Sequence, residues 1–166
     1  MYYEPFHNRF PDIALRETRT LTVLDMPGLP LGDYAFTEAY CNESGCDCRR
    51  VFFNVIQGET GRVVATIAYG WESTEYYVKW LGRDDPAAIS SLQGPALNLG
   101  SPQSELALAL LAQMPLLLSD PQYVARLKRH YQMFKAAVNQ EAGLRSKPKK
   151  SESPKATYRK GKARNK

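Results

Sequence analysis

The sequence contains few cysteines and none of the familiar nucleotide-binding or hydrolase motifs. Only 3 of its 166 residues are cysteine, and 43% are hydrophobic, so the chain can bury a core as one globular domain without a scaffold of disulfides. It has no phosphate-binding loop, no dinucleotide-binding fingerprint, no Ser/His/Asp arrangement and no internal repeat. These absences leave no standard motif from which a reaction can be inferred.

A secretory signal and a membrane-spanning segment are also missing from the sequence. Residues 1–5 do not combine a basic start with an apolar stretch. The most apolar run, residues 106–118, includes Gln113 and Pro115, and it is shorter than the roughly 20 residues that a membrane helix needs. We therefore expect a cytoplasmic protein with no membrane contact, in which residues 106–118 form a buried helix.

Charge is distributed unevenly along the chain. Residues 144–166 contain ten Lys or Arg and one acidic residue, a net charge of 10 − 1 = +9. Residues 1–143 contain the other 22 − 10 = 12 basic and 17 − 1 = 16 acidic residues, a net charge of −4. The basic segment has two prolines and few apolar groups, which predicts a disordered tail after a globular domain of residues 1–143.

The basic tail predicts a polyanionic partner. A segment of this charge can neutralise several phosphate groups without folding, so RNA, the ribosome or DNA is the expected partner. The residues expected to contact it are Lys147, Lys149, Lys150, Lys155, Arg159, Lys160, Lys162 and Arg164. Because such contacts go to backbone phosphates, we expect little preference for nucleotide sequence.

The apolar pattern of the domain predicts strands first and helices afterwards. The expected strands are residues 20–24, 34–41, 51–57 and 62–69, the last two joined as a hairpin by the glycine-flanked residues 58–61. Capping residues and prolines predict helices over residues 72–81, 86–92, 101–113 and from 121 onwards, the third ending before Pro115. A stripe in the last helix indicates core packing: Val124, Leu127, Tyr131, Phe134 and Val138. The fold class is therefore α+β, a small antiparallel sheet with a C-terminal helical layer.

The three cysteines lie within eight residues, in the pattern C-x4-C-x-C. Cys41 closes a predicted strand, whereas Cys46 and Cys48 belong to the connection that enters the next one. Gly45 can supply the positive φ angle with which a short loop turns its thiolates towards one point. Zinc is the ion that this pattern favours. The alternatives are inert or incidentally oxidised thiols, and thiols that act in catalysis or redox sensing.

A fourth ligand would have to come from elsewhere. His130 lies beside the apolar stripe of the last predicted helix, where it can leave the helix edge as a ligand or be an ordinary surface or partly buried histidine. His7 and Asp47 are weaker candidates. Three thiolates with one imidazole make a closed site, whereas three thiolates with water leave a position open for chemistry. We expect a structural zinc site; the competing hypothesis is an enzyme with a cysteine nucleophile or open-site zinc and His130 as base.

Charged and aromatic residues near the cysteines have several interpretations. Arg49 and Arg50 can lower thiol pKa values, contact an anionic partner or form ion pairs with Glu43 and Asp47. Five aromatic residues can stack on nucleic-acid bases if they are exposed, but their strand and helix spacings are typical of a core: Tyr69, Trp71, Tyr76, Tyr77 and Trp80.

Several segments of the chain resemble an uncharacterised bacterial protein family. They are Tyr40-Cys41-Asn42 with Gly45-Cys46-Asp47-Cys48-Arg49-Arg50-Val51, Tyr69-Gly70-Trp71-Glu72-Ser73 and Leu127-Lys128-Arg129-His130-Tyr131. The resemblance covers most of residues 33–139. Some relatives carry a C-terminal SEC-C motif, a small zinc-binding element related to the tail of the preprotein translocase ATPase, but residues 144–166 of this chain contain no cysteine. The resemblance points to Cys41, Cys46, Cys48 and His130, and it implies no reaction.

Overall fold

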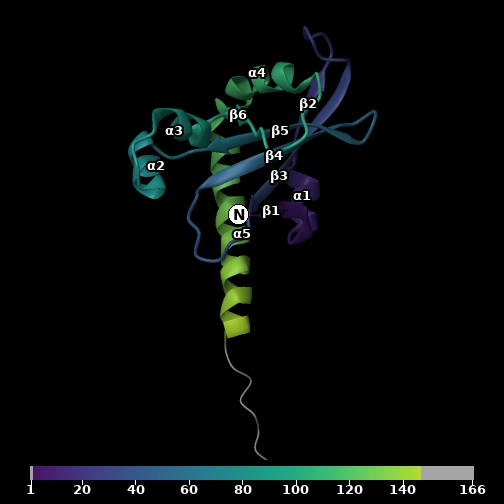
Figure 1. Cartoon of the computed structure of the whole chain (residues 1–166). Helices are drawn as coiled ribbons and strands as arrows, with labels where there is room; N and C mark the ends of the chain where they lie inside the picture. Colours follow the sequence, from purple (N-terminus) through teal and green to yellow (C-terminus); the bar gives the residue numbers. More distant parts are fainter. Residues whose placement is uncertain (1, 147–166) are drawn as a thin grey trace, which may run out of the picture.

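The computed structural model describes residues 2–146, the last two by their backbone alone. Its α+β architecture confirms the fold class expected from the sequence (Figure 1). In chain order the elements are the strand β1 (Tyr3–Pro5), the short 3-10 helix η1 (Phe6–Asn8), α1 (Pro11–Glu17), β2 (Arg19–Val23), β3 (Gly32–Cys41), β4 (Arg50–Gln57), β5 (Arg62–Gly70), α2 (Thr74–Leu81), α3 (Pro86–Gln93), β6 (Ala96–Leu97), α4 (Ala107–Leu118) and α5 (Pro121–Ser146).

The sheet formed by the described residues has six strands, all paired antiparallel. Its order is β1-β3-β4-β5-β6, and β2 pairs with the earlier part of β3. The predicted β4–β5 hairpin is confirmed: the strands pair from Arg50 opposite Gly70 to Gln57 opposite Arg62. The start of β4 therefore lies beside the end of β5, at the same end of the sheet as the end of β3.

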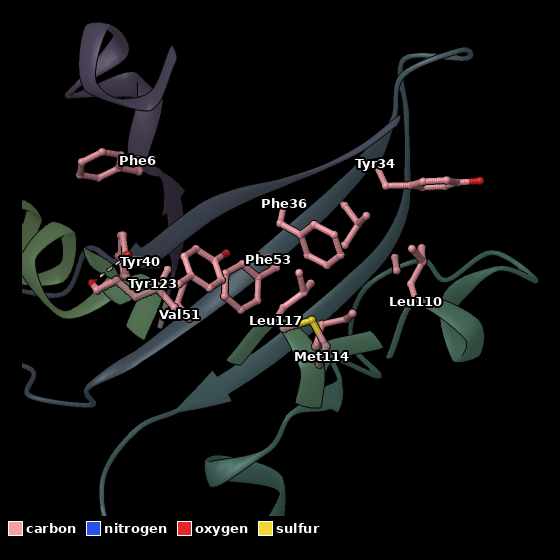
Figure 2. Packing of buried hydrophobic residues seen from close by; sticks show 14 of the residues in the cluster. Phe6, Tyr34, Phe36, Tyr40, Val51, Phe53, Leu110, Met114, Leu117 and Tyr123 are labelled. Atoms are coloured by element: carbon pink, nitrogen blue, oxygen red, sulfur yellow. Dashed lines mark hydrogen bonds between the residues drawn. The ribbon is translucent and has the colours of Figure 1, made fainter. Parts of the chain in front are cut away.

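The main core lies between one face of the sheet and the helices α4 and α5. Because strand side chains alternate between faces, every second residue of β3, β4 and β5 is buried there. Figure 2 shows Phe36 and Phe53 of the sheet packed with Met114 and Leu117 of α4. A smaller cluster of Ala39, Phe52 and Ala68 packs separately, with Tyr3 of β1 against it.

Helix α5 runs behind the sheet in Figure 1 and contacts β3 and β4. Its predicted stripe is buried at Leu127, Tyr131, Phe134 and Val138, whereas Val124 is half-buried and Tyr123 is fully buried instead. The helix continues through Gly143 to Ser146. Apart from residues 144–146, the predicted tail and all of its predicted nucleic-acid contacts lie outside the described residues.

Helix α4 begins later than predicted because the residues before it bond to the edge of β5. The Thr66 N–H donates to Gln103 Oε1 at 3.0 Å, and Gln103 Nε2 donates back to the Thr66 carbonyl at 3.0 Å. The Ser104 hydroxyl donates to the Val64 carbonyl at 2.7 Å. These bonds satisfy backbone groups at the sheet edge, and they hold residues 103 and 104 outside the helix.

Helix α4 covers nearly all of the apolar run of residues 106–118, as its apolarity predicted, and it ends later than the position of Pro115 predicted, since that proline lies inside it. A proline within a helix costs about 3 kcal/mol. Leu110, Met114 and Leu117 are buried on this helix, and each such side chain contributes about 1.5–3 kcal/mol when fully buried. Burial on both sides of the proline therefore outweighs the lost hydrogen bond.

No helix in the described part of the chain is long and apolar enough to cross a membrane.

Candidate metal centre

The three cysteines converge where β3 ends and β4 begins. Cys41 is the last residue of β3, and Cys46 and Cys48 lie in the connection of residues 42–49. Their Sγ atoms all lie within 4.8 Å of one another, and the thiols are free. Cys41 and Cys48 are fully buried, whereas Cys46 is partly exposed. Together they form a cluster that could hold a metal ion, and the described residues contain no other group of this kind.

Two residues with positive φ shape the loop between β3 and β4. Gly45 has a φ of +76°, as its position predicted, and its N–H donates to the side-chain oxygen of Asn139 on α5 at 3.0 Å. Arg49 has a φ of +48°, which is uncommon for a residue with a Cβ. Its N–H donates to the Tyr131 hydroxyl at 3.3 Å, and its carbonyl accepts from the Tyr77 hydroxyl at 2.9 Å. Helices α2 and α5 therefore hold the loop in the conformation that brings the thiols together.

A buried lysine supplies positive charge beside the cysteines. Lys135 on α5 is 7% exposed, and its Nζ donates to the carbonyl oxygens of Cys41 at 3.2 Å and Glu43 at 2.6 Å. A buried ammonium group needs such acceptors because it has lost its contact with water. Lys135 thus connects α5 to the cysteine loop and places a cation beside the thiols.

The three thiols do not ionise equally. The pKa of Cys41 is lowered to about 6, chiefly by a hydrogen bond from Cys48 and despite burial. The same hydrogen bond, together with burial, raises the pKa of Cys48, and burial and the Cys41 thiolate raise that of Cys46. Of the three thiols, Cys41 therefore loses its proton most readily. Because metal ions bind thiolates, a metal ion held here would displace protons mainly from Cys46 and Cys48.

The two arginines after the cysteines have partners of their own. Arg49 pairs with Asp47 at 2.9 Å and with Glu72 at 3.2 Å, and its guanidinium lies over the Tyr76 ring. Arg50 is buried and donates to two carbonyl oxygens at the C-terminal end of α3. The sequence allowed several interpretations of Arg49, and the structure supports the one in which it forms an ion pair with Asp47. The Asp47 carboxylate belongs to this pair and not to the cysteine group.

The aromatic residues near the cysteines pack inwards. Tyr77 is fully buried, and Tyr69, Trp71 and Trp80 are half-buried against the main core. The Trp71 ring lies edge-on to Tyr131, with ring centroids 5.3 Å apart. For these four residues the contacts support the core interpretation over base stacking, whereas the Tyr76 ring lies against the Arg49 guanidinium.

The structure does not bring His130 to the cysteines. Successive residues of an α-helix point about 100° apart, so Tyr131 faces the cysteine loop while His130 faces β3. The His130 Nδ1 lies 2.7 Å from Glu38 Oε2, and its Nε2 lies 2.9 Å from Glu17 Oε2. Both ring nitrogens are therefore engaged by carboxylates. The structure brings the three cysteines together. Contrary to the expectation from the sequence, His130, the fourth predicted metal ligand, lies away from them.

Sequence reasoning missed the buried polar cluster around His130. Glu38 is 6% exposed and also accepts a hydrogen bond from the Tyr40 hydroxyl at 2.6 Å. The Phe6 ring stacks on the imidazole with ring centroids 4.4 Å apart. The alternation of side chains along β3 could have indicated that Glu38 is buried, because it places Glu38 on the same face as Tyr34, Phe36 and Tyr40.

A cavity of about 310 Å³ adjoins this cluster and is lined by residues of η1, α1 and β3 together with His130. His7, the weaker ligand candidate, is exposed on η1 and lines the same cavity, not the cysteine group. Partial burial tends to raise the pKa of Glu17, but its hydrogen bond with His130 and the charge of Arg129 bring that pKa below its usual value. Glu17 therefore remains an acceptor for His130 at neutral pH.

Comparison with known proteins identifies no relative. A scan against protein-family models, a search of curated proteins and a search of solved structures found no match. The resemblance to the bacterial cysteine-cluster family stays a prediction. The support for a function therefore comes from the sequence and the geometry of this chain itself.

Proposed function

We propose that the protein binds one zinc ion through Cys41, Cys46 and Cys48, and that the ion holds the end of β3 close to the start of β4. The observation that carries the proposal is the approach of the three Sγ atoms to within 4.8 Å of one another. Tetrahedral zinc with bonds of about 2.3 Å holds its thiolates roughly 3.8 Å apart, so the loop needs only a small closure.

The chemistry of the donors favours zinc over other ions. Thiolates select zinc, copper(I) or iron–sulfur clusters over hard ions such as magnesium and calcium. Zinc is the member of that group that binds as a single ion without redox chemistry. Three free thiols in close contact are also suited to a reducing, intracellular compartment, which is the location that we propose.

Elemental analysis of the purified, untagged protein should find about one zinc per chain. A variant in which Cys41, Cys46 and Cys48 are all serine should contain none, because it has lost every thiolate donor. Ser44→Ala is the matched control, since Ser44 lies in the same loop and its hydroxyl contacts Asn139. Equal zinc contents in the wild type and the triple-serine variant would refute the proposal.

We further propose that the protein is an interaction module that contacts RNA, the ribosome or DNA through its basic tail. The support is the contrast between a net charge of +9 in residues 144–166 and −4 in residues 1–143. An acidic body repels a polyanion while the tail attracts it, so binding should depend on the tail and on salt.

Ending the chain at Ser146 tests the tail without shortening α5. This truncation removes nine Lys or Arg and one Glu, a charge of 9 − 1 = +8. If the tail neutralises about six phosphates of single-stranded RNA, log K should fall with log salt at a slope of roughly −4, and the truncated protein should show a slope near zero with weaker binding. Zinc content and melting temperature should not change. Undiminished RNA binding by the truncated protein would place recognition on the body instead.

The contacts of His130 and of the cysteine loop do not support an enzyme in which a cysteine is the nucleophile and His130 is the base. The imidazole is enclosed by two glutamates and Phe6, whereas the backbone of the cysteine loop bonds to Tyr131 and Lys135. A general base must lie within hydrogen-bond reach of the proton that it removes. The cysteine cluster is therefore better explained as a metal centre.

A further inference from the structure

The chain supplies three donors to an ion that usually takes four ligands. His130 is held by two glutamates, and Asp47 is paired with Arg49. His7 is exposed on η1, at the cavity beside His130. Residues 147–166 contain no cysteine and no histidine. No further thiolate or imidazole of this chain is thus placed to complete the site.

The cluster is accessible on the side of Cys46. This residue is partly exposed, and its neighbours, residues 43–45 and Asp47, are exposed. Cys41 and Cys48 are fully buried. A ligand from outside can therefore reach an ion in this site past Cys46, while the two buried thiolates stay covered by the fold.

Charge decides which kind of ligand fits. Zn²⁺ with three thiolates carries 2 − 3 = −1, and buried Lys135 beside the loop supplies +1. A neutral fourth donor keeps this balance, whereas a fourth thiolate or a carboxylate adds uncompensated negative charge beside two buried sulfurs. Imidazole nitrogen is a neutral donor that suits zinc. We propose, on the basis of the proposed zinc site, that its fourth position is open and takes an imidazole nitrogen from outside the chain.

Cobalt(II) in place of zinc in the full-length protein tests this inference by absorption spectroscopy. Sulfur-to-cobalt charge transfer reports the thiolate bonds, and the visible d–d bands report the complete ligand set. Imidazole should shift the d–d bands until one imidazole is bound per cobalt, and the charge-transfer band should remain. A charge-transfer band with no response to imidazole would overturn this inference alone. A missing charge-transfer band would contradict the zinc site itself.

Two variants and two further probes make the test specific. Glu43→Gln and Asp47→Asn should each give the wild-type cobalt spectrum, both before and after imidazole is added. A changed spectrum before imidazole is added would show that a carboxylate of this chain fills the fourth position on the metal, and it would overturn the inference. 2-Mercaptoethanol should bind more weakly than imidazole, and tighter binding would overturn the choice of a neutral donor. A peptide with one central histidine separates the sources: a response to it supports a histidine of a partner protein, and a response to imidazole alone supports a small molecule.

Discussion

Removing the proposed zinc ion from the wild-type protein should lower the melting temperature by roughly 10 °C. An ion present at about 1,000 times its Kd stabilises the folded state by about 4 kcal/mol, and each kcal/mol shifts the melting temperature of a domain of this size by about 2–4 °C. The effect follows from the position of the site, because the thiolates connect the end of β3 to the residues just before β4. Thermal melts with and without a zinc chelator measure the difference.

The triple-serine variant separates the loss of metal from other effects of the chelator. Its melting temperature should already be low and should not respond further. In the wild type, amide hydrogen exchange should increase on chelation in residues 41–50 and stay unchanged at residues 58–61, which form the turn at the other end of β4. A zinc-free wild type with an unchanged melting temperature would exclude the structural role while leaving the site itself in place.

Local signals predicted the starts of α2 and α3, where the hydrogen bonds are local. The Ser73 side chain accepts from the Tyr76 N–H at the start of α2, and Asp85 accepts from the Ala88 N–H at the start of α3. Gly82 follows α2 in the left-handed conformation, and glycine at this position is a typical helix stop. In each case the residues that interact are at most a few positions apart, so the sequence pattern alone is sufficient.

The sequence did not predict η1 and α1, although both form by local hydrogen bonds, and it also missed elements that depend on distant partners. The strand β1 has three residues, too few for a period, and it exists because Tyr3 pairs opposite Cys41 on β3. The start of α4 depends in the same way on bonds from Gln103 and Ser104 to β5. Such residues carry no periodic signal of their own, because their conformation is set by an edge that forms elsewhere in the chain.

The candidate site shows the same division between local and distant information. The three cysteines are close in sequence, so their spacing and Gly45 were enough to predict that they converge. The position of His130 depends on how α5 is rotated against the sheet, and a difference of one residue, about 100°, directs Tyr131 and not His130 towards the cysteine loop. No local pattern specifies that rotation, which is set by the packing of the whole stripe against β3 and β4.

Replacing Glu38 with alanine should destabilise the fold by about 1–3 kcal/mol, the usual cost of leaving a buried polar group without its hydrogen-bond partner. The change removes one hydrogen-bond acceptor from both the Nδ1 of His130 and the Tyr40 hydroxyl. Because Glu38 is only 6% exposed, water cannot easily replace it there. Urea unfolding of the variant and the wild type measures the loss. Glu17→Ala should cost less, because the Glu17 side chain is 29% exposed and water can replace it as acceptor.

The double variant Glu38→Leu/His130→Leu distinguishes an unpaired polar group from a loss of packing. Leucines at both positions remove the polar atoms together, so the double variant should be more stable than Glu38→Ala despite carrying two changes. Both variants should keep the wild-type zinc content, because Glu38 and His130 lie outside the cysteine group. Loss of zinc from a folded Glu38→Ala or double variant would mean that this cluster and the metal centre are coupled, and it would return His130 to the set of candidate ligands.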